Sequence, residues 1–346
     1  MATTVRTWSA IIVDLLSGRD LTQDDTAWAM DQVVRGEATS AQISGFLIAL
    51  RAKGETATEI AGLASALRGF ATPVDVPGNT VDIVGTGGDR TNAVNISTMA
   101  AIVAASTGIT VVKHGGRAAS SASGGSADLV EQLGISLDLS PTAAANVAVE
   151  TGITFLFAPR FNPGLRHVAA ARRELGVPTA FNILGPLINP ADPTHAVVGV
   201  ADARMQPVIA SVLAGRGCTA LVVRGEDGLD KLTTTAVSRV WTVSGGSTAE
   251  QLLDPRELGL TMTTPELLQG GSAATNAEIL HRLLDGEAGP VRDVVLLNAA
   301  AALATLEEGP LLERLHHSLE RCRAAVDSGA AARTLASWTA ASRSLR

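Results

Sequence analysis

Two consecutive strand-and-loop units place the strongest constraint on how this chain can fold. An apolar strand at 81–84 leads into Gly-Thr-Gly-Gly-Asp at 85–89, and Asn-Ile-Ser-Thr at 95–98 then opens an alanine-rich helix. A second apolar strand at 109–112 leads into Lys-His-Gly-Gly-Arg at 113–117. Strands with nearly continuous apolar character are buried on both faces, as in a parallel sheet, where loops after the strands gather at one edge.

Both loops carry groups that bind anions. Glycines let backbone N–H groups approach an anion closely, and a helix N-terminus adds its positive dipole end. Side-chain donors are available from Ser97, Thr98, Lys113, Arg117, Ser120 and Ser121. One glycine turn is usually plain turn chemistry, but two such loops about 25 residues apart favour a ligand with more than one phosphate group. A dinucleotide fingerprint does not fit, because Arg90 stands where it needs glycine, and no Lys-Ser/Thr pair follows as a P-loop requires.

Bulk composition excludes several classes of protein. The chain has 346 residues, of which 46% are hydrophobic and 18% charged, so it can bury a large core in one large or two unequal domains. A net charge of -7 argues against a general nucleic-acid or anionic-membrane binder, since either needs a basic face. No apolar run approaches the roughly 18 residues of a membrane span. Cys218 and Cys322 are too few and too distant for a disulfide framework or a zinc site, which predicts a cytoplasmic protein.

The pattern along the chain predicts an α/β fold: a small all-helical N-terminal domain (1–72) and a larger α/β domain (79–346) with a mostly parallel central sheet. Residues 73–78, with two prolines, form the expected linker. The strands are expected at 81–84, 109–112, 153–157, 196–200, 220–223 and 237–243. Helices are expected at 97–106, 127–133, 141–150, 166–175 and 205–214, and again from 264 onward, where they cover the sheet.

Two further segments carry charged groups that suit a phosphate site. The acid-rich stretch 224–230 follows a strand, and its carboxylates could hold Mg²⁺ beside substrate phosphates. An arginine-rich helix contains Arg166, Arg172 and Arg173, one of which could bind a carboxylate substrate through its planar fork. Alone, the acid-rich stretch would more often be a solvated turn, and the arginine-rich helix is equally well explained as a solvated basic face. Together with the loops after 84, 112 and 157, they predict one crevice at the carboxyl edge of the sheet.

Catalytic groups are scarce in this sequence. There is no catalytic triad and no metal-binding histidine pair, and His114 is the only histidine set inside a motif. Lys113 is expected to direct its charge toward phosphate and not into the core. The pattern fits a transfer reaction driven by positioning and by stabilisation of a leaving group.

The chain resembles the anthranilate phosphoribosyltransferases of tryptophan biosynthesis. The matching motifs occur in the family's order over essentially the whole length, at 81–89, 95–98, 113–117, 157–159, 172–175, 181–190 and 228–230. The resemblance implies a pentosyltransferase that moves the 5-phosphoribosyl group of phosphoribosyl pyrophosphate (PRPP) to anthranilate with Mg²⁺. It also implies a homodimer built through the helical domain, which residues 163–190 would join.

The resemblance also implies roles for individual residues. PRPP would be bound by Gly85, Gly88, Asp89, Asn95, Ile96, Ser97, Thr98, Lys113, Arg117, Ser120 and Ser121. The acceptor would be bound by Gly85, His114, Gly116, Asn162 and Arg172. The metal would be held by Ser97 and Asp230, with Glu226 or Asp227 as further candidates.

Departures from the family pattern fall at acceptor and metal positions. Gly116 stands where the family usually has Asn, Asn162 where it has His, and Lys231 where it has Glu. In the first loop, Arg90 and Ala93 replace the usual Gly and Ser or Thr. Lys231 should oppose Mg²⁺ at its position, or could bind pyrophosphate directly. Two alternatives therefore stay open: a paralogue with another aromatic or heteroaromatic acceptor, and a non-catalytic binding relative.

Overall fold

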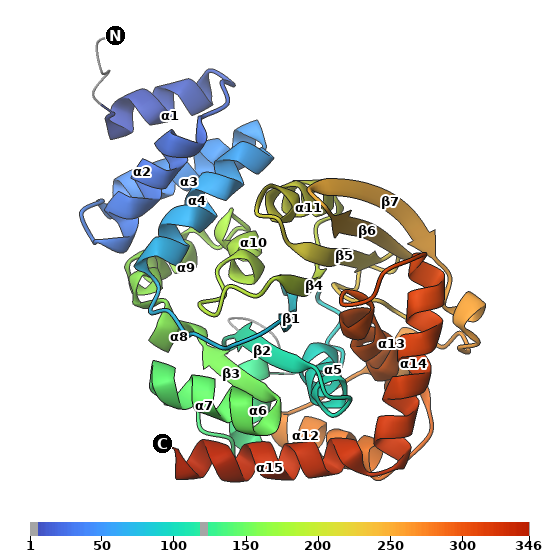
Figure 1. Ribbon diagram of the computed structural model, residues 1–346. Helices are drawn as coiled ribbons and strands as arrows, with labels where there is room; N and C mark the ends of the chain where they lie inside the picture. Colours follow the sequence, from blue (N-terminus) through green and yellow to red (C-terminus); the bar gives the residue numbers. More distant parts are fainter. Residues whose placement is uncertain (1–5, 118–123, 346) are drawn as a thin grey trace.

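The computed structural model describes residues 6–117 and 124–345, and the chain begins with a group of packed helices (Figure 1). Their bounds are α1 (Trp8–Leu16), α2 (Gln23–Val34), α3 (Ser40–Lys53) and α4 (Ala57–Phe70). Thr22, Thr39 and Thr56 each cap the following helix, and in each case the residue three positions on caps the threonine in return. These reciprocal bonds satisfy backbone N–H groups that a helix start would otherwise leave unpaired.

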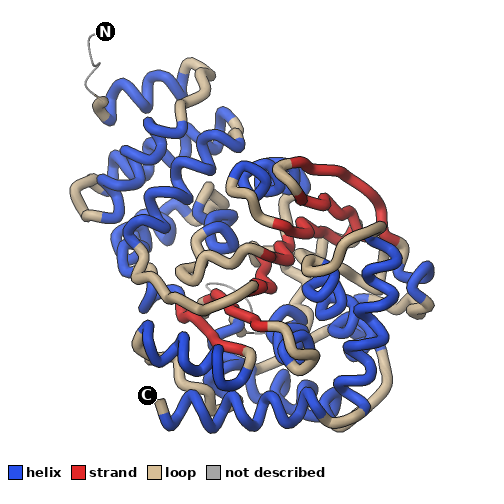
Figure 2. Tube along the Cα trace, viewed as in Figure 1, coloured by secondary structure: helices blue, strands red, loops and turns tan. Residues whose placement is uncertain are grey.

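A mixed sheet follows, with the helices arranged around it (Figure 2). Within the described residues its seven strands lie in the order β3-β2-β1-β4-β5-β6-β7. The strands are β1 (Thr80–Gly85), β2 (Thr110–Gly115), β3 (Ile153–Phe157), β4 (His195–Gly199), β5 (Thr219–Gly225), β6 (Ser238–Ser244) and β7 (Ser247–Leu253). Neighbours from β3 to β5 pair in parallel, and β5, β6 and β7 pair antiparallel. The predicted α/β class with a mostly parallel sheet is confirmed.

Helices cover both faces of the sheet (Figure 1). The α/β part contains α5 (Ile96–Ala105), α6 (Ser126–Gln132), α7 (Pro141–Thr151), α8 (Ala158–Phe161), α9 (Ala169–Leu175), α10 (Phe181–Leu184), α11 (Gln206–Gly215), α12 (Ala273–Leu284), α13 (Pro290–Ala304), α14 (Leu311–Asp327) and α15 (Ala330–Ser344). Short 3₁₀ turns are η1 (Pro163–Val168), η2 (Gly185–Leu187), η3 (Ala203–Met205), η4 (Pro255–Leu258) and η5 (Pro265–Leu268).

Alternate residues of the parallel strands enter two separate hydrophobic cores. Val197 and Leu221 pack with α5 and α13 in one core, whereas Val198 and Val222 pack in the other, which includes α11 and the N-terminal helices. Successive side chains of a strand point to opposite faces, so a buried central strand needs apolar residues at every position. This explains why the strand sequences are continuously apolar.

The segment 163–190 lies against the N-terminal helices. η1 contacts α2 and α9 contacts α3, and Val168 and Ala171 are buried in the same core as Leu47. Gly164 is packed so closely that a Cβ there would lie 2.7 Å from the Cβ of Val34. On these contacts we propose that 163–190 forms one domain with 1–72, while 79–346 supplies the α/β domain.

The expected elements differ from the observed ones in three places. Strand β2 continues through Lys113 to Gly115, so those residues lie in the strand and not in a loop. The expected helix 166–175 is divided into η1 and α9, because Pro163 and the turn after it start a separate 3₁₀ segment. Strand β7 was missed, since this edge strand is mostly exposed and lacks an apolar run.

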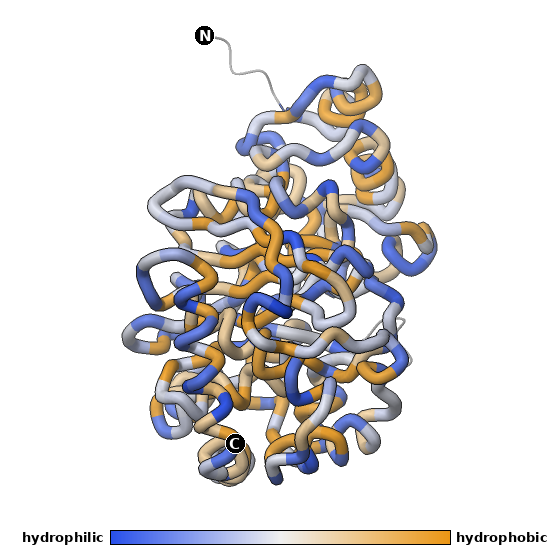
Figure 3. Tube along the Cα trace, turned by 90° about the vertical axis from the view of Figure 1, so that its right-hand side faces the viewer, coloured by the Kyte–Doolittle hydropathy of each residue, from blue (hydrophilic) through white to orange (hydrophobic). Residues whose placement is uncertain are grey.

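The first and last described helices lie far apart. In the perpendicular view of Figure 3 the N-terminal helices stand above the α/β body, and the C-terminus lies at the opposite end. Throughout the two described ranges, every helix is too short or too polar to cross a membrane.

Candidate functional site

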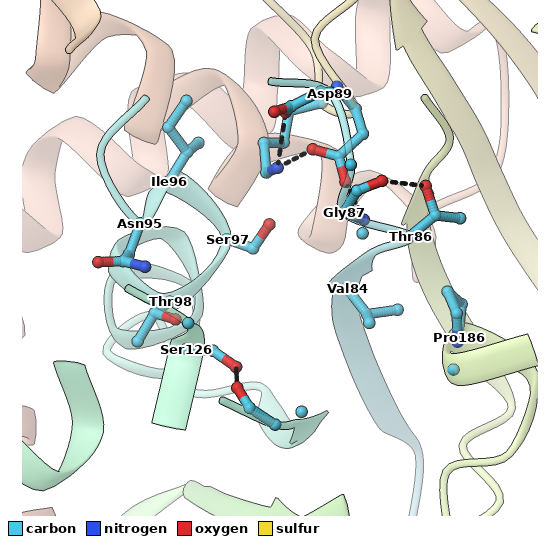
Figure 4. A pocket seen from close by; sticks show the side chains of 18 of the residues that line it. Val84, Thr86, Gly87, Asp89, Asn95, Ile96, Ser97, Thr98, Ser126 and Pro186 are labelled. Atoms are coloured by element: carbon cyan, nitrogen blue, oxygen red, sulfur yellow. Dashed lines mark hydrogen bonds and ion pairs between the residues drawn. The ribbon is translucent and has the colours of Figure 1, made fainter. Parts of the chain in front are cut away.

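A cavity of about 460 Å³ lies where β1 and β2 end and α5 begins (Figure 4). Its walls come from the loop after β1, the end of β2, the residue after β3, the α9–α10 region and the loop after β5. The structure thus brings the predicted segments together at the carboxyl edge of the sheet. The predicted site residues that line it are Gly85, Gly88, Asp89, Asn95, Ile96, Ser97, Thr98, Lys113, His114, Gly116, Arg117, Arg172 and Asp230. Ser120 and Ser121 lie outside the described residues.

The N-terminus of α5 opens into this cavity. Asn95 precedes the helix but makes no side-chain cap hydrogen bond to it. Its amide instead donates to the carbonyl of Gly124 at 3.4 Å and accepts from Nδ2 of Asn276 at 2.7 Å. The Ser97 hydroxyl points into the space between α5 and the loop that carries Asp89 (Figure 4). A helix start left open in this way attracts an anion.

Asp230 is the centre of a buried polar cluster. Its carboxylate is fully buried, accepts from the backbone N–H of Gly87 at 2.7 Å, and forms an ion pair with the Lys231 ammonium. Lys231 also lies 3.6 Å from the Asp89 carboxylate. Two glycines make room for this residue: a Cβ at Gly85 would lie 2.3 Å from Asp230 Oδ2. A Cβ at Gly199 would lie 1.6 Å from the Asp230 carbonyl oxygen.

Lys113 and Asp82 are two buried charged groups deeper in the sheet that attract each other electrostatically. Lys113 is only 2% exposed and its Nζ donates to the carbonyl of Ile83 at 2.5 Å, but the residue also lines the cavity, so the expectation that its charge faces phosphate stays a prediction. Burial, together with repulsion by Lys231, lowers the pKa of Lys113 to about 8, although the attraction of Asp82 acts in the opposite direction. Burial raises the pKa of Asp82 to about 6, although Lys113 and the Asn189 amide both favour its carboxylate.

His114 is held in one neutral tautomer. Its Nδ1 lies 3.2 Å from the carbonyl of Gly185, which can only accept, so Nδ1 carries the proton. Nε2 then accepts from the Asn162 amide at 3.2 Å. Burial lowers the pKa of His114 to about 4, so the ring is uncharged near neutral pH. Asn162 is 2% exposed and lies behind His114, so it does not line the cavity as a direct acceptor contact would require.

Arg172 provides a positive group on the opposite wall. Its guanidinium lies 5.6 Å from the centre of the Phe181 ring, and burial lowers its pKa. Among residues 6–117 and 124–345 no acidic side chain forms an ion pair with it. A half-buried arginine without a carboxylate partner is suited to bind a carboxylate that comes from a ligand.

The positive charge of Arg117, unlike that of Arg172, is paired with acidic side chains of the chain itself. Its guanidinium is bound by Asp128 at 2.7 Å and by Glu131 at 2.9 Å, and it lies over Phe157. In this arrangement the two acids on α6 already neutralise the side chain that was predicted to bind phosphate. The residue therefore contributes to the cavity wall and fixes the start of α6.

The whole chain matches known proteins. Residues 9–71 match the helical bundle domain of the glycosyl transferase family, and residues 77–332 match its a/b domain. Anthranilate phosphoribosyltransferases of Streptomyces griseus and Streptomyces avermitilis are 56% and 58% identical to it, over 97% of this chain and 96% of theirs. The chain belongs to the anthranilate phosphoribosyltransferase family.

Solved structures of this family share the fold. The anthranilate phosphoribosyltransferase of Thermus thermophilus superposes with a TM-score of 0.89 at 39% identity, over 96% of this chain and 99% of that one. The enzyme of Saccharomyces cerevisiae in complex with PRPP and Mg gives a TM-score of 0.88 at 29% identity, over 98% of both chains.

The acidic residues in the loop after β5 divide into two groups. Asp230 faces the cavity, but Glu226 and Asp227 do not line it. Glu226 accepts from Arg239 at 3.0 Å, and Asp227 accepts from the N–H of Leu229 at 3.0 Å and closes its own turn. Because both carboxylates are bound by these partners, the geometry does not support either one as a replacement for the metal ligand that position 231 lacks.

Sequence reasoning missed two residues that shape the site. Asp82 lies in the middle of β1 and is 1% exposed, and Asn189 donates to it at 2.8 Å and to the carbonyl of Val112 at 2.8 Å. The signal was present, because an Asp between Val81 and Ile83 in a strand buried on both faces needs a partner. The partners come from distant parts of the chain: Asn189 precedes β4, and the backbone N–H of His114 in β2 donates to Asp82 at 3.3 Å.

Proposed function

We propose that this chain is an anthranilate phosphoribosyltransferase, which transfers the 5-phosphoribosyl group of PRPP to the amine of anthranilate and releases pyrophosphate in tryptophan biosynthesis. One observation carries the proposal. A single cavity joins the open N-terminus of α5 and Lys113, which suit phosphate groups, to Arg172, which suits an aromatic carboxylate.

The cavity supports this reaction by positioning and charge stabilisation. The amine nitrogen forms a bond to ribose C1 while the bond from C1 to the pyrophosphate oxygen breaks, and the nitrogen then releases one proton to pyrophosphate or water. The backbone of the first loop, the N-terminus of α5 and Lys113 would stabilise the charge that develops on pyrophosphate. An arylamine is weakly basic and has a free lone pair, so the neutral His114 is not needed as a strong base.

For PRPP we propose the residues that line the phosphate end of the cavity: Gly85, Gly88, Asp89, Asn95, Ile96, Ser97, Thr98 and Lys113. For anthranilate we propose Arg172, His114 and Gly116, with Asn162 acting through the histidine. The oxygen donor that suits Mg²⁺ is the Ser97 hydroxyl, because both carboxylates are bound within the chain, Asp89 by Thr91 and Lys231, and Asp230 by Gly87 and Lys231. When bound, Mg²⁺ would supply positive charge to the pyrophosphate.

The experiment follows the loss of anthranilate fluorescence in the presence of PRPP and Mg²⁺, for Arg172→Ala and for Arg173→Ala as the matched control. Arg173 is exposed on the same helix and does not line the cavity. We expect Arg172→Ala to raise the KM for anthranilate about 10- to 100-fold, the effect of losing a charge-assisted hydrogen bond, and Arg173→Ala to leave it unchanged.

Two results would contradict the proposal. Equal KM values for the two variants would remove Arg172 from the acceptor site. No turnover of anthranilate by the unaltered protein, with PRPP binding still seen by calorimetry, would point to the alternative acceptor that Gly116 and Asn162 leave open.

We further propose that the protein is a homodimer formed through its helical domain and located in the cytoplasm. Apolar side chains are exposed on that domain at Val13 and Leu16 of α1 and at Ile48 of α3, and α1 packs on α3. Exposed apolar groups gathered on one domain are typical of an interface. The two cysteines, Cys218 and Cys322, are free and buried, which agrees with a reducing compartment.

A further inference from the structure

In the polar cluster formed by Asp89, Asp230 and Lys231, the two aspartates carry the negative charge of metal ligands, but Lys231 is positively charged. Its ammonium pairs with the buried carboxylate of Asp230 and lies 3.6 Å from that of Asp89, so it occupies the position between two acids. A divalent cation bridging protein carboxylates and substrate phosphates would need this same position. The Lys231 ammonium therefore occupies the position that a metal ion would need.

The backbone next to Lys231 is held in place by the core. The next residue, Leu232, is bound at both backbone groups by Asn298 of α13, which accepts from its N–H at 3.1 Å and donates to its carbonyl at 2.8 Å. Asn298 is 1% exposed, so this clamp is part of the core. The backbone from which the Lys231 side chain extends is therefore fixed beside the two acids.

The same ammonium is accessible from the cavity. Lys231 lines it, and 18% of its side chain is exposed, whereas Asp230 is completely buried. An ammonium has three donors, and the two acids take up only part of that capacity. The remaining N–H donors of the ammonium are available to the cavity that Ser97 and the N-terminus of α5 also line, where the phosphate groups would bind.

We propose that Lys231 is a built-in cation that replaces a divalent metal ion at the Asp89–Asp230 pair and binds the pyrophosphate of PRPP directly. The inference rests on the proposed function, because it presumes that PRPP is the ligand of this cavity. The protein then binds PRPP with one fewer metal ion than a variant that has an acid at position 231.

The experiment counts metal ions and measures PRPP affinity without recourse to turnover. Mn²⁺ bound per protein–PRPP complex is determined by electron paramagnetic resonance, and PRPP binding is titrated calorimetrically with EDTA and with Mg²⁺. The variants are Lys231→Glu and Lys231→Gln. Arg90→Glu is the control, because Arg90 is an exposed cation in the neighbouring loop that does not line the cavity, and it undergoes the same change of charge.

We expect the unaltered protein and Arg90→Glu to bind PRPP in EDTA, and both lysine variants to bind it there about 10- to 100-fold more weakly. Lys231→Glu should bind one more Mn²⁺ per complex than the unaltered protein. Equal Mn²⁺ numbers in these two proteins would overturn the inference, as would loss of PRPP binding in EDTA by the unaltered protein. If Lys231→Glu does not fold, the EDTA titrations of the unaltered protein and Lys231→Gln decide. Failure of every protein to bind PRPP even with Mg²⁺ would refute the proposed function as well.

Discussion

Replacing Asp82 by asparagine should change how the stability of this protein depends on pH. Asp82 is 1% exposed in β1, and burial raises its pKa from 3.8 to about 6. Because the folded protein holds this proton more tightly than the unfolded chain, its contribution to stability is fully present below about pH 3.8. It is lost as the pH rises through about 6.

The magnitude follows from the size of the shift. One unit of pKa difference corresponds to about 1.4 kcal/mol, so the shift of Asp82 contributes ~3 kcal/mol in full, of which ~2 kcal/mol is lost from the free energy of unfolding between pH 4 and pH 6.5. Asparagine cannot ionise, and its side-chain oxygen can still accept the hydrogen bond that Asn189 donates at 2.8 Å. The variant should therefore keep the fold and lack this part of the pH dependence.

The assay is urea unfolding of both proteins at several values between pH 4 and pH 6.5, with the difference in free energy of unfolding plotted against pH. Other carboxyl groups cancel in that difference, which should change by ~2 kcal/mol in favour of Asp82→Asn as the pH rises from 4 to 6.5. Asp285→Asn is the control, because it removes one carboxylate from an exposed position at the end of α12. Parallel curves for the unaltered protein and Asp82→Asn would refute the reasoning, since they would mean that burial does not raise the pKa of Asp82.

Two further variants test the packing beneath the site and the proposed dimer. Gly199→Ala should lower the free energy of unfolding by roughly 3 kcal/mol and weaken PRPP binding, because its Cβ would lie 1.6 Å from the Asp230 carbonyl oxygen. Gly215→Ala, whose Cβ meets nothing within 4 Å, should be neutral; equal melting temperatures for the two would contradict this account. Leu16→Asp should yield a monomer by light scattering, because Leu16 is 72% exposed on α1. Leu252→Asp, a 59% exposed position on β7, should leave the assembly unchanged, and a dimer that persists in Leu16→Asp would exclude that part of α1 from the interface.

Local sequence patterns were sufficient for most of the fold. Apolar runs bounded by glycine predict β1, β3 and β5 within two residues, because a strand buried on both faces leaves a continuous signal. Strand β7 left no such signal, since most of its side chains are exposed at the edge of the sheet. The extent of β2 also could not be read from the sequence, because Lys113 and His114 look like loop residues until partners in the folded protein bury them.

The candidate site also has some features that the local sequence predicts and others that depend on the fold. The glycine loop after β1, the start of α5 and the cations near it are local features, and a few neighbouring residues suffice to create an anion site. The state of each charged group depends on residues distant in the chain. Asp82 meets Asn189, Lys231 lies between Asp89 and Asp230, and Arg117 is neutralised by α6 instead of a phosphate. Only the folded chain brings such partners together, because electrostatic and hydrogen-bond interactions act over a few ångströms in space, whatever the separation in sequence.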